Sequence, residues 1–405
     1  MRRWISVAAA VVAALLGVAA HVSLYSPISP LPLRLPVSPL TFTPNNLLQV
    51  LPSTPRWSCY VCALVLMSSA CVVGTQRAEK LGEGRLQGPE DVYVDGDGTL
   101  YTASRDGWIK RMHAANRSWE DWRLVGGSSL LGLTLSVSGD DVLICDADKV
   151  SFCRFADDVI EASDGSGVYF SDASTRFGLH EYFLDLLEAR PNGRLLKFDP
   201  STKETTVVLA DLAFPNGVAL SSDQDFLVVC ETWRCGKVLP WHSLLLVCSL
   251  FRLCSVCCSS DSYRFGPRFR CLKHWLKGKK TGETEVFIDN LPGGPDNIKL
   301  APDGSFWIAV LQFRSKGMDL LHRSPTAKKV VAAFPKVVKA LQARGIGGMV
   351  MNVGSDGKIR RVLDDSDGKV MSFVTSAMEF QGYLYVGSLH SNFVGKFDLR
   401  SDHPL

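Results

Sequence analysis

The sequence predicts an all-β protein, a six-bladed β-propeller with short helical insertions, an N-terminal signal or anchor helix and one incomplete blade. Two observations support this fold class. A phrase made of a polar pair, an apolar alternation and a turn built on Asp-Gly recurs along the chain, and period-two alternation on both sides of such a turn is typical of a β-hairpin. Apolar residues at helical spacing, in contrast, occur in only two short stretches after the N-terminal run.

The recurring phrase occurs six times, with the last copy truncated. Its equivalent apolar anchors are Val92, Leu133, Val159, Val218, Ile298 and Met378. Six hairpin phrases indicate six blades, because a propeller blade is a four-stranded sheet of about 40–50 residues. A β-sandwich of unrelated hairpins is the alternative, but it would not need a polar pair at the head of each phrase.

The intervals between successive anchors, 41, 26, 59, 80 and 80 residues, identify one short blade and two insertions. The second interval is too short for four strands, so we expect half a blade to be missing between Lys149 and Arg154. The last interval contains a helical stretch at residues 325–343. The fourth contains residues 235–268, which are apolar and Cys-rich and show neither strand alternation nor a polar helix face. The propeller, residues 78–399, is interrupted there.

Residues 50–77 form a second stretch of this kind, and the two stretches hold eight of the 12 Cys. Cys59-x-x-Cys62 and Cys254-x-x-Cys257 would make a four-Cys zinc site in one interpretation, and both stretches would be short membrane segments in another. We favour a third, translated non-coding sequence such as a retained intron. The other four Cys, without an evident disulfide framework, are Cys145, Cys153, Cys230 and Cys271. We expect the chain as written to fold poorly, because a truncated blade leaves strand edges unpaired.

The N-terminus has the features of a sequence that directs a protein into the secretory pathway. Arg2 and Arg3 precede an apolar run over residues 5–20, which predicts a signal peptide or an uncleaved signal anchor at residues 1–22. A Pro-rich spacer follows at residues 23–49. The folded part is then expected in the secretory lumen, where the sequon Asn116-Arg117-Ser118 makes Asn116 a glycosylation candidate.

Charge and helical patterning constrain the partners. The formal net charge is +3, from 44 basic and 41 acidic residues that are scattered along the chain, which argues against a nucleic-acid partner. We expect a small-molecule substrate, and membrane contact only through the N-terminal anchor.

The helical stretches at residues 179–190 and 325–343 are expected to lie on one face of the propeller, either as a lid over a site or as plain connectors. His180 and His390 are surface or structural residues in the favoured interpretation, and in the alternative either of them overhangs the central tunnel.

The heads of the repeated phrases carry the candidate site. Equivalent positions of all blades converge on the tunnel of a propeller, and the heads here bear oxygen: Glu90, Asp157, Asn216, Asp296 and Asn297. Carboxylate and amide oxygens around one point are what a hard cation such as Ca²⁺ requires. Such a cation would polarise an ester or lactone carbonyl and lower the pKa of a bound water. The alternative is that these side chains cap local turns.

Motifs of other enzyme classes are absent from the sequence, which has no nucleophile elbow, Walker loop or His-Glu-x-x-His pattern. The candidate catalytic residues are therefore two carboxylates, Asp296 at a phrase head and Glu379 near the final strand. Glu379 is an exposed turn carboxylate in the favoured interpretation and a general base in the alternative.

Several runs resemble plant strictosidine synthase-like proteins, which are similar to the adipocyte plasma membrane-associated protein of animals. These runs are Gly88-Pro89-Glu90-Asp91, Arg154-Phe155-Ala156-Asp157-Asp158, Phe214-Pro215-Asn216-Gly217, Gly293-Gly294-Pro295-Asp296-Asn297 and Gly382-Tyr383-Leu384-Tyr385-Val386-Gly387-Ser388. The resemblance implies a six-bladed propeller that enters the secretory pathway, typically toward the vacuole, with the endoplasmic reticulum membrane as the alternative.

The resemblance leaves three functions open. The wider superfamily includes metal-dependent lactonases and paraoxonases, whose ligands are matched here by Glu90, Asn216 and Asp296, with Asp157 in place of a common Asn. This implies a metal-dependent hydrolase of an ester or lactone. Strictosidine synthases condense an amine with an aldehyde through a glutamate that would fall near Ser376 or Ala377, a few positions before Glu379. A non-catalytic luminal propeller that binds a ligand is the third possibility.

Overall fold

The computed structural model describes residues 2–31, 78–139, 141–149, 153–233, 269–312, 316–342, 347–365 and 368–402. The two Cys-rich stretches that we interpret as non-coding sequence lie outside the described residues. So do the candidate zinc cysteines and residues 32–49 of the Pro-rich spacer.

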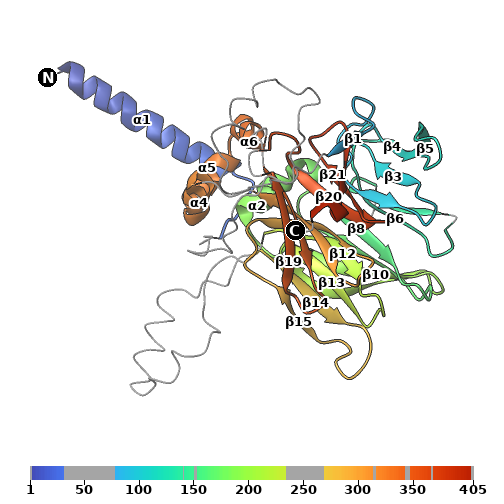
Figure 1. Cartoon of the computed structure of the whole chain (residues 1–405). Helices are drawn as coiled ribbons and strands as arrows, with labels where there is room; N and C mark the ends of the chain where they lie inside the picture. Colours follow the sequence, from blue (N-terminus) through green and yellow to red (C-terminus); the bar gives the residue numbers. More distant parts are fainter. Residues whose placement is uncertain are drawn as a thin grey trace, which may run out of the picture.

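The described residues form six antiparallel sheets arranged as the blades of a propeller, five with four strands and one with two (Figure 1). From the innermost strand outward, the strands are β2 (Val92–Val94), β3 (Leu100–Ala103), β4 (Trp108–Met112) and β5 (Trp119–Leu124) in blade 1; β6 (Leu130–Leu135) and β7 (Val142–Asp146) in blade 2; β8 (Ala156–Glu161), β9 (Val168–Asp172), β10 (Gly193–Asp199) and β11 (Glu204–Leu212) in blade 3; β12 (Pro215–Leu220), β13 (Phe226–Glu231), β14 (Arg270–Trp275) and β15 (Thr284–Ile288) in blade 4; β16 (Gly294–Leu300), β17 (Phe306–Gln312), β18 (Gly347–Val353) and β19 (Ile359–Asp365) in blade 5; and β20 (Val374–Phe380), β21 (Tyr383–Ser388), β22 (Val394–Asp398) and β1 (Glu79–Leu81) in blade 6.

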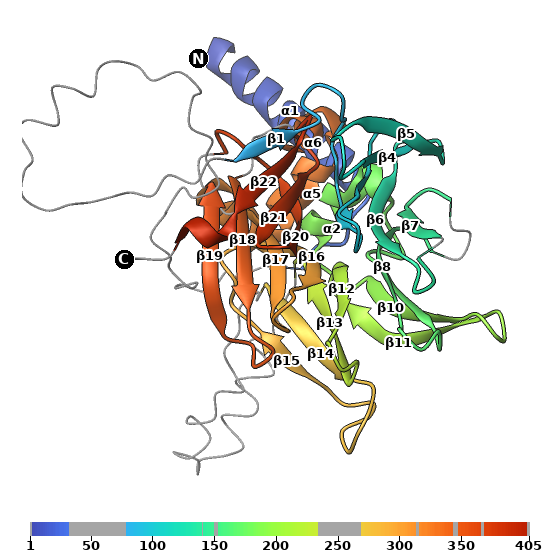
Figure 2. The ribbon, with the colours of Figure 1, turned by 45° about the vertical axis from the view of Figure 1, so that its right-hand side comes forward.

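The six innermost strands contact one another in a closed ring, in the order β2, β6, β8, β12, β16, β20 and back to β2 (Figure 2). The ring is also closed by hydrogen bonds, because β1 from the start of the domain supplies the outer strand of the last blade, where Glu79 pairs with Lys396 and Leu81 with Val394. All six predicted anchors lie on innermost strands. The prediction of a six-bladed propeller with one incomplete blade is confirmed.

Burial falls from the centre of the propeller to its rim. Every residue of β13 is buried, and so are the first six of β17, because these second strands lie between two neighbouring blades. Their continuous apolar sequences are typical of strands covered on both faces. The outer strands β5 and β11 are largely exposed and more polar.

Blade 2 is the incomplete blade. It consists of β6 and β7, and the chain then passes directly to β8. This is the half blade that the 26-residue interval predicts to be missing. Cys145 in β7 and Cys153 just before β8 are both buried free thiols.

Helices gather at one end of the sheets (Figure 1). The predicted stretch at 179–190 forms a 3₁₀ turn (Leu179–Glu181) and α2 (Tyr182–Glu188), and the stretch at 325–343 forms α5 (Pro325–Ala332) and α6 (Pro335–Gln342). Helix α4 (Lys316–Arg323) precedes them and was not predicted, and a 3₁₀ turn (Leu399–Asp402) follows β22. Helices α2 and α5 are in contact.

The N-terminal run forms helix α1 (Arg2–Tyr25), which projects from this helical end of the molecule (Figure 1). Its last turns touch the insertion, since the His21 ring stacks on Phe334. The following segment packs on α2, with Ile28 buried and the Ser29 amide donating to Glu188. Across the described residues no helix is long and apolar enough to cross a membrane. Whether residues 1–22 are a signal or an anchor stays a prediction.

A disulfide joins Cys230 in β13 to Cys271 in β14, two residues directly opposite each other in the sheet. The sequence gives no sign of this disulfide, because Cys230 and Cys271 are 41 residues apart and the second Cys-rich stretch lies between them. Strand pairing within blade 4 places the two thiols together.

Candidate functional site

The predicted site residues lie at the heads of the innermost strands, where the sheet register is irregular. Pairing with the second strand skips two residues between Ala156 and Val159 in β8, between Pro215 and Val218 in β12, and between Pro295 and Ile298 in β16. A bulge of this kind redirects side chains and is common beside active sites. The first skipped residue is Asp157, Asn216 or Asp296, and Glu90 holds the corresponding place ahead of β2.

These four side chains line one cavity of about 630 Å³. They form its polar floor: Glu90 is 1% exposed, and Asp157 and Asp296 are each 3% exposed. Blade 2 contributes an apolar side chain, Leu131, at the same height. We call Glu90, Asp157 and Asp296 the floor carboxyls.

The floor carboxyls share an environment that disfavours their charge. Burial raises the pKa of Glu90 well above its ordinary value, and the nearby charge of Asp296 raises it further. Burial and then Asp296 also raise the pKa of Asp157, and burial raises that of Asp296, which an Asn216 hydrogen bond partly offsets. Glu90 Oε2 and Asn216 Oδ1 are buried oxygens without a hydrogen-bond partner among the described residues. A buried oxygen left unpaired is costly, which points to a ligand at this floor.

Asp91 and Asp158, which follow Glu90 and Asp157 in the sequence, do not face the cavity but bind backbone amides. Asp91 accepts hydrogen bonds from Val92 N and from Leu133 N of the next blade, each at 2.8 Å. Asp158 accepts from Val159 N at 2.9 Å and from Val218 N of the next blade at 2.8 Å. Each therefore links two neighbouring blades. We call Asp91 and Asp158 the tunnel carboxyls.

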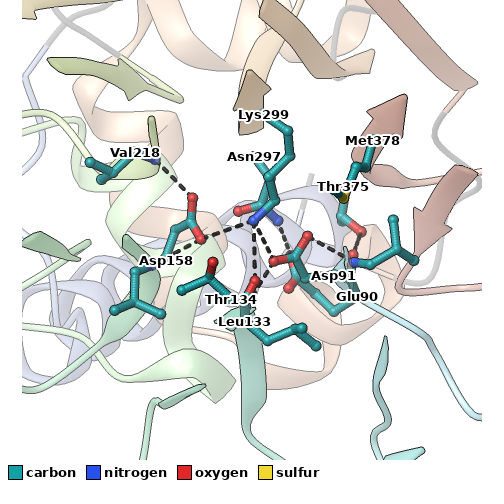
Figure 3. A network of polar contacts seen from close by, with 12 residues as sticks. Glu90, Asp91, Leu133, Thr134, Asp158, Val218, Asn297, Lys299, Thr375 and Met378 are labelled. Carbon is teal, nitrogen blue, oxygen red and sulfur yellow. Dashed lines mark hydrogen bonds and ion pairs between the residues drawn. The ribbon is translucent and has the colours of Figure 1, made fainter. Parts of the chain in front are cut away.

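Lys299 of β16 reaches across the propeller to both tunnel carboxyls, as Figure 3 shows. Its Nζ lies 2.7 Å from Asp91 Oδ2 and 3.5 Å from Asp158 Oδ1, and its side chain is 12% exposed. Burial alone would lower the pKa of Lys299, but the charges of Asp158 and Asp91 raise it above its ordinary value. The ammonium therefore stays charged and supplies the tunnel carboxyls with a counter-ion.

Asn297, predicted as a metal ligand, does not line the cavity. Its amide nitrogen donates to Glu90 Oε1 at 2.8 Å and so fixes the orientation of that carboxyl (Figure 3). Its Oδ1 is buried without a partner among the described residues. The structure thus places Asn297 as the residue that holds Glu90 in position.

The cavity walls are mainly apolar and aromatic. Phe155, Phe214 and Phe373 line them, each two residues before a strand-head position, together with Trp233, whose ring lies 3.9 Å from that of Phe214. Each of the three Phe residues directly precedes an innermost strand, so the repeated Phe-x-polar pattern was a usable sequence signal. Asp185 of α2 accepts a hydrogen bond from Trp233 Nε1 at 2.9 Å, which ties the helical insertion to this wall.

Four basic side chains also line the cavity. His180 and His390 do so, as only the less favoured interpretation of the sequence has it, and Arg105 and Lys339 do so as well. Burial and the charge of Arg105 lower the pKa of His390, so that its ring is neutral at pH 7. Nothing local in the sequence marks Arg105, which follows β3 in an ordinary turn.

Glu379 does not join this site. It lies on β20 at the end away from the head, paired with Leu384, and its carboxylate accepts a hydrogen bond from Trp307 Nε1 at 2.8 Å. It is absent from the cavity lining. The expectation of a catalytic base at Glu379 is corrected on this ground, because distance along the strand carries it toward the other end of the sheet. Asn116 lies on the exposed turn between β4 and β5.

The floor fits a hard cation through a mixed donor set. Among the described residues no group of three or more His, Cys, Asp or Glu could hold a metal ion by itself. The two unpartnered oxygens that face the cavity are a carboxylate oxygen of Glu90 and an amide oxygen of Asn216. Carboxylate and amide oxygens completed by water are ordinary ligands of Ca²⁺.

Comparison with known proteins gives consistent matches. A family model for strictosidine synthase matches residues 157–240, and one for the N-terminal part of strictosidine synthase-like proteins matches residues 76–112. The protein strictosidine synthase-like 6 of Arabidopsis thaliana is 32% identical over 347 residues, which cover 80% of this chain and 82% of that protein. The adipocyte plasma membrane-associated protein of Mus musculus is 27% identical over 365 residues, covering 80% and 79%.

Solved structures of low sequence identity are also similar. A gluconolactonase from Xanthomonas campestris has a TM-score of 0.47 at 13% identity and covers 80% of this chain and 90% of its own. The calcium-binding protein regucalcin from Agrobacterium tumefaciens has a TM-score of 0.44 at 14% identity, covering 80% and 93%. At TM-scores below 0.5, neither says anything about the chemistry of this chain.

Proposed function

The chain belongs to the strictosidine synthase-like family, and from that premise we propose that it is a divalent-cation-dependent hydrolase of esters or lactones. One observation carries the proposal. The floor of the cavity combines three buried carboxyls with an amide, and two of its oxygens have no partner among the described residues. The walls above this floor are mainly apolar and aromatic, as a site that takes the apolar body of an organic ester or lactone requires.

The unpartnered oxygens of Glu90 and Asn216 would bind the cation, and Asp157 and Asp296 are the other oxygen-bearing side chains of the floor. Asn297 keeps Glu90 in place from the side of β16. We propose Ca²⁺, because all the donor atoms are hard oxygens and no thiolate or imidazole lies on the floor. When bound, such a cation polarises a carbonyl oxygen and makes a bound water more acidic.

We assign the general base to Asp296. Asp296 lines the cavity and accepts a hydrogen bond from the Asn216 side chain, so its carboxylate is placed to take a proton from a water in the cavity. Asp296 takes one proton from water as the water oxygen bonds to the carbonyl carbon. The ester C–O bond then breaks, and the proton passes to the departing alkoxide, which leaves an acid and an alcohol. For a lactone, both groups remain on one molecule.

Amine–aldehyde condensation receives no support from the position of Glu379, which lies outside the cavity and is bound to Trp307. The near-head residues of β20 are Thr375 and Ser376, which carry no charge. If the activity test below detects no hydrolysis, the function that remains is a binding protein without catalysis.

We propose further that the propeller resides in the secretory lumen, toward the vacuole. The Cys230–Cys271 disulfide is typical of an oxidising compartment. The Asn116 sequon lies on an exposed turn, where glycosylation has access. Mobility on gels before and after glycosidase treatment of the plant-expressed protein tests this assignment.

The test of the reaction is hydrolysis of a panel of aryl esters and γ- and δ-lactones by the full chain, with added Ca²⁺ and with excess chelator. We expect turnover that the chelator abolishes and Ca²⁺ restores, and we expect it to be lost in Asp296→Asn. Asp356→Asn, on the exposed turn before β19, serves as the matched control. Activity that survives the chelator, or Asp296→Asn with wild-type turnover, would contradict the proposal.

A further inference from the structure

Arg105 is a cation without a fixed partner at the wall of the cavity. It is partly buried and lines the cavity, yet its guanidinium makes no hydrogen bond or ion pair with any residue in the described parts of the chain. A guanidinium offers five N–H donors in a planar fork and stays protonated in proteins. Partial burial without a partner suits a group that receives an anion.

The position of Arg105 is set by the segment that carries Glu90. The Arg105 amide donates to Gln87 O at 2.7 Å. A Cβ added to Gly88 would lie 2.8 Å from Arg105 Cγ and 2.7 Å from Leu389 O, and Gly88 has φ of +51°. Only glycine fits there, so the Arg105 stem packs closely against the backbone two residues before Glu90. The base of the Arg105 side chain is therefore held close to the segment that carries Glu90.

The charges near Arg105 leave it available. The Glu90 carboxylate attracts it, and Asp148 and Tyr182 act more weakly in the same sense, while burial lowers the Arg105 pKa. Because Glu90 also faces the floor, a cation bound there would neutralise much of this attraction. Neighbouring His390 is neutral at pH 7 and packs in a tilted arrangement against Phe373, with ring centres 4.6 Å apart, so it does not compete for an anion.

We propose that Arg105 recognises an anionic group on the substrate, and that the cavity takes amphipathic organic acids: esters or lactones with an aromatic-sized apolar body and a carboxylate. The body would lie on Phe155, Phe214 and Trp233, and the carboxylate would accept a bidentate pair of hydrogen bonds from Arg105. A volume of about 630 Å³ accommodates a molecule of this size. The ester or lactone part of this inference rests on the proposed function; the preference for a carboxylate does not.

The test is calorimetric binding of a matched pair, 3-phenylpropanoate and its amide 3-phenylpropanamide, to the full chain with chelator present. We expect the acid to bind about tenfold more tightly than the amide, because a charge-assisted bidentate contact replaces neutral ones. Arg105→Gln should bind both ligands equally, and Arg105→Lys should keep part of the difference. Arg123→Gln, an exposed arginine of blade 1, is the control and should behave as wild type.

Equal binding of acid and amide by the wild-type chain, absence of binding by either, or an acid preference that persists in Arg105→Gln would each overturn the inference. Acetate, which lacks the apolar body, should bind more weakly than 3-phenylpropanoate, and equal binding would also contradict it. Repeating the titration with Ca²⁺ separates the two proposals. A chain that prefers the acid but never hydrolyses an ester loses the proposed reaction and keeps Arg105 as the anion site.

Discussion

Two neighbouring layers of acidic side chains meet at the centre of this propeller, and they differ in whether the protein supplies partners for their oxygens. The tunnel carboxyls, Asp91 and Asp158, each accept two backbone N–H bonds and share the ammonium of Lys299. The floor carboxyls, one residue earlier in two of the strands, face a cavity, and Glu90 keeps an oxygen without a partner among the described residues. Carboxyl groups thus stabilise the fold in the tunnel layer, whereas the floor layer leaves a carboxyl oxygen without a partner within the described residues.

This difference shows how to separate a structural carboxylate from a functional one. Burial alone does not distinguish the layers, since both are almost completely buried. The discriminating feature is whether the folded chain itself supplies the counter-charge and donors. The tunnel layer is complete without a ligand, whereas the floor layer is complete only with one.

The largest effect is expected from removing the counter-ion of the tunnel layer. Lys299→Met leaves Asp91 and Asp158 facing each other without the ammonium, and breaking a buried ion pair from one side costs about 3–5 kcal/mol. Chemical denaturation should show this loss of unfolding free energy. Lys358→Met, whose side chain is 84% exposed, should change it by much less. A Lys299→Met protein as stable as wild type would show that the tunnel layer needs no counter-ion.

Neutralising the floor layer should act in the opposite direction. Glu90→Gln removes a charge that burial and Asp296 disfavour, so the cation-free protein should gain on the order of 1 kcal/mol of unfolding free energy. The same variant should lose about 100-fold in Ca²⁺ affinity, because one ionised ligand is gone. Thermal unfolding with and without Ca²⁺ measures both. Asp91→Asn, the tunnel neighbour, should destabilise instead, and equal effects of the two variants would erase the distinction between the layers.

The pH dependence of stability should follow the raised carboxyl pKa values. A carboxyl whose pKa is higher in the folded protein binds more protons when folded, so its contribution is present below its ordinary pKa of about 4 and is lost as pH rises through the folded value. Burial raises the folded pKa of all three floor carboxyls well above that ordinary value, and it raises the pKa of the tunnel carboxyl Asp158 to about 6. The cation-free protein should therefore lose stability between about pH 4 and 6 and continue to do so above it. Saturating Ca²⁺ should flatten this fall, and a profile unaffected by Ca²⁺ would contradict the assignment.

The smallest change in Ca²⁺ affinity is expected from adding a donor at Leu131, where the floor lacks an oxygen. Leu131 is the apolar member of the strand-head layer. Leu131→Asn places one more amide oxygen there, which should tighten Ca²⁺ binding by a few-fold at a stability cost of about 2 kcal/mol from the lost apolar contacts. Leu133→Asn, in the same strand, should cost stability without any gain in affinity. Calorimetric titration of the two variants compares them directly.

The fold could be predicted from sequence because its signals are local. Alternation, Asp-Gly turns and the 26-residue interval report on strands and spacing, and they identified the blades and the truncated one. Propeller symmetry then placed Glu90, Asp157, Asn216 and Asp296 at one level. The division of work between Asp157 and Asp158 was not predictable, because it depends on the bulge between Ala156 and Val159.

Other parts of the site depend on long-range packing that no local pattern reports. Arg105 reaches the cavity through its contact with Gly88, and Lys299 reaches Asp91 from 208 residues away. Glu379 was misplaced because the strand it belongs to runs away from the cavity. The Cys230–Cys271 pair required the register of β13 with β14 across the second Cys-rich stretch.

The central claim is that the floor of the cavity is completed by a divalent cation. Isothermal titration of the chelator-stripped full chain with Ca²⁺ at pH 7, alongside Glu90→Gln, tests it most directly. The account predicts one Ca²⁺ per chain in the wild type and about 100-fold weaker binding in Glu90→Gln. No Ca²⁺ binding by a folded wild-type chain, or equal binding by both proteins, would contradict it.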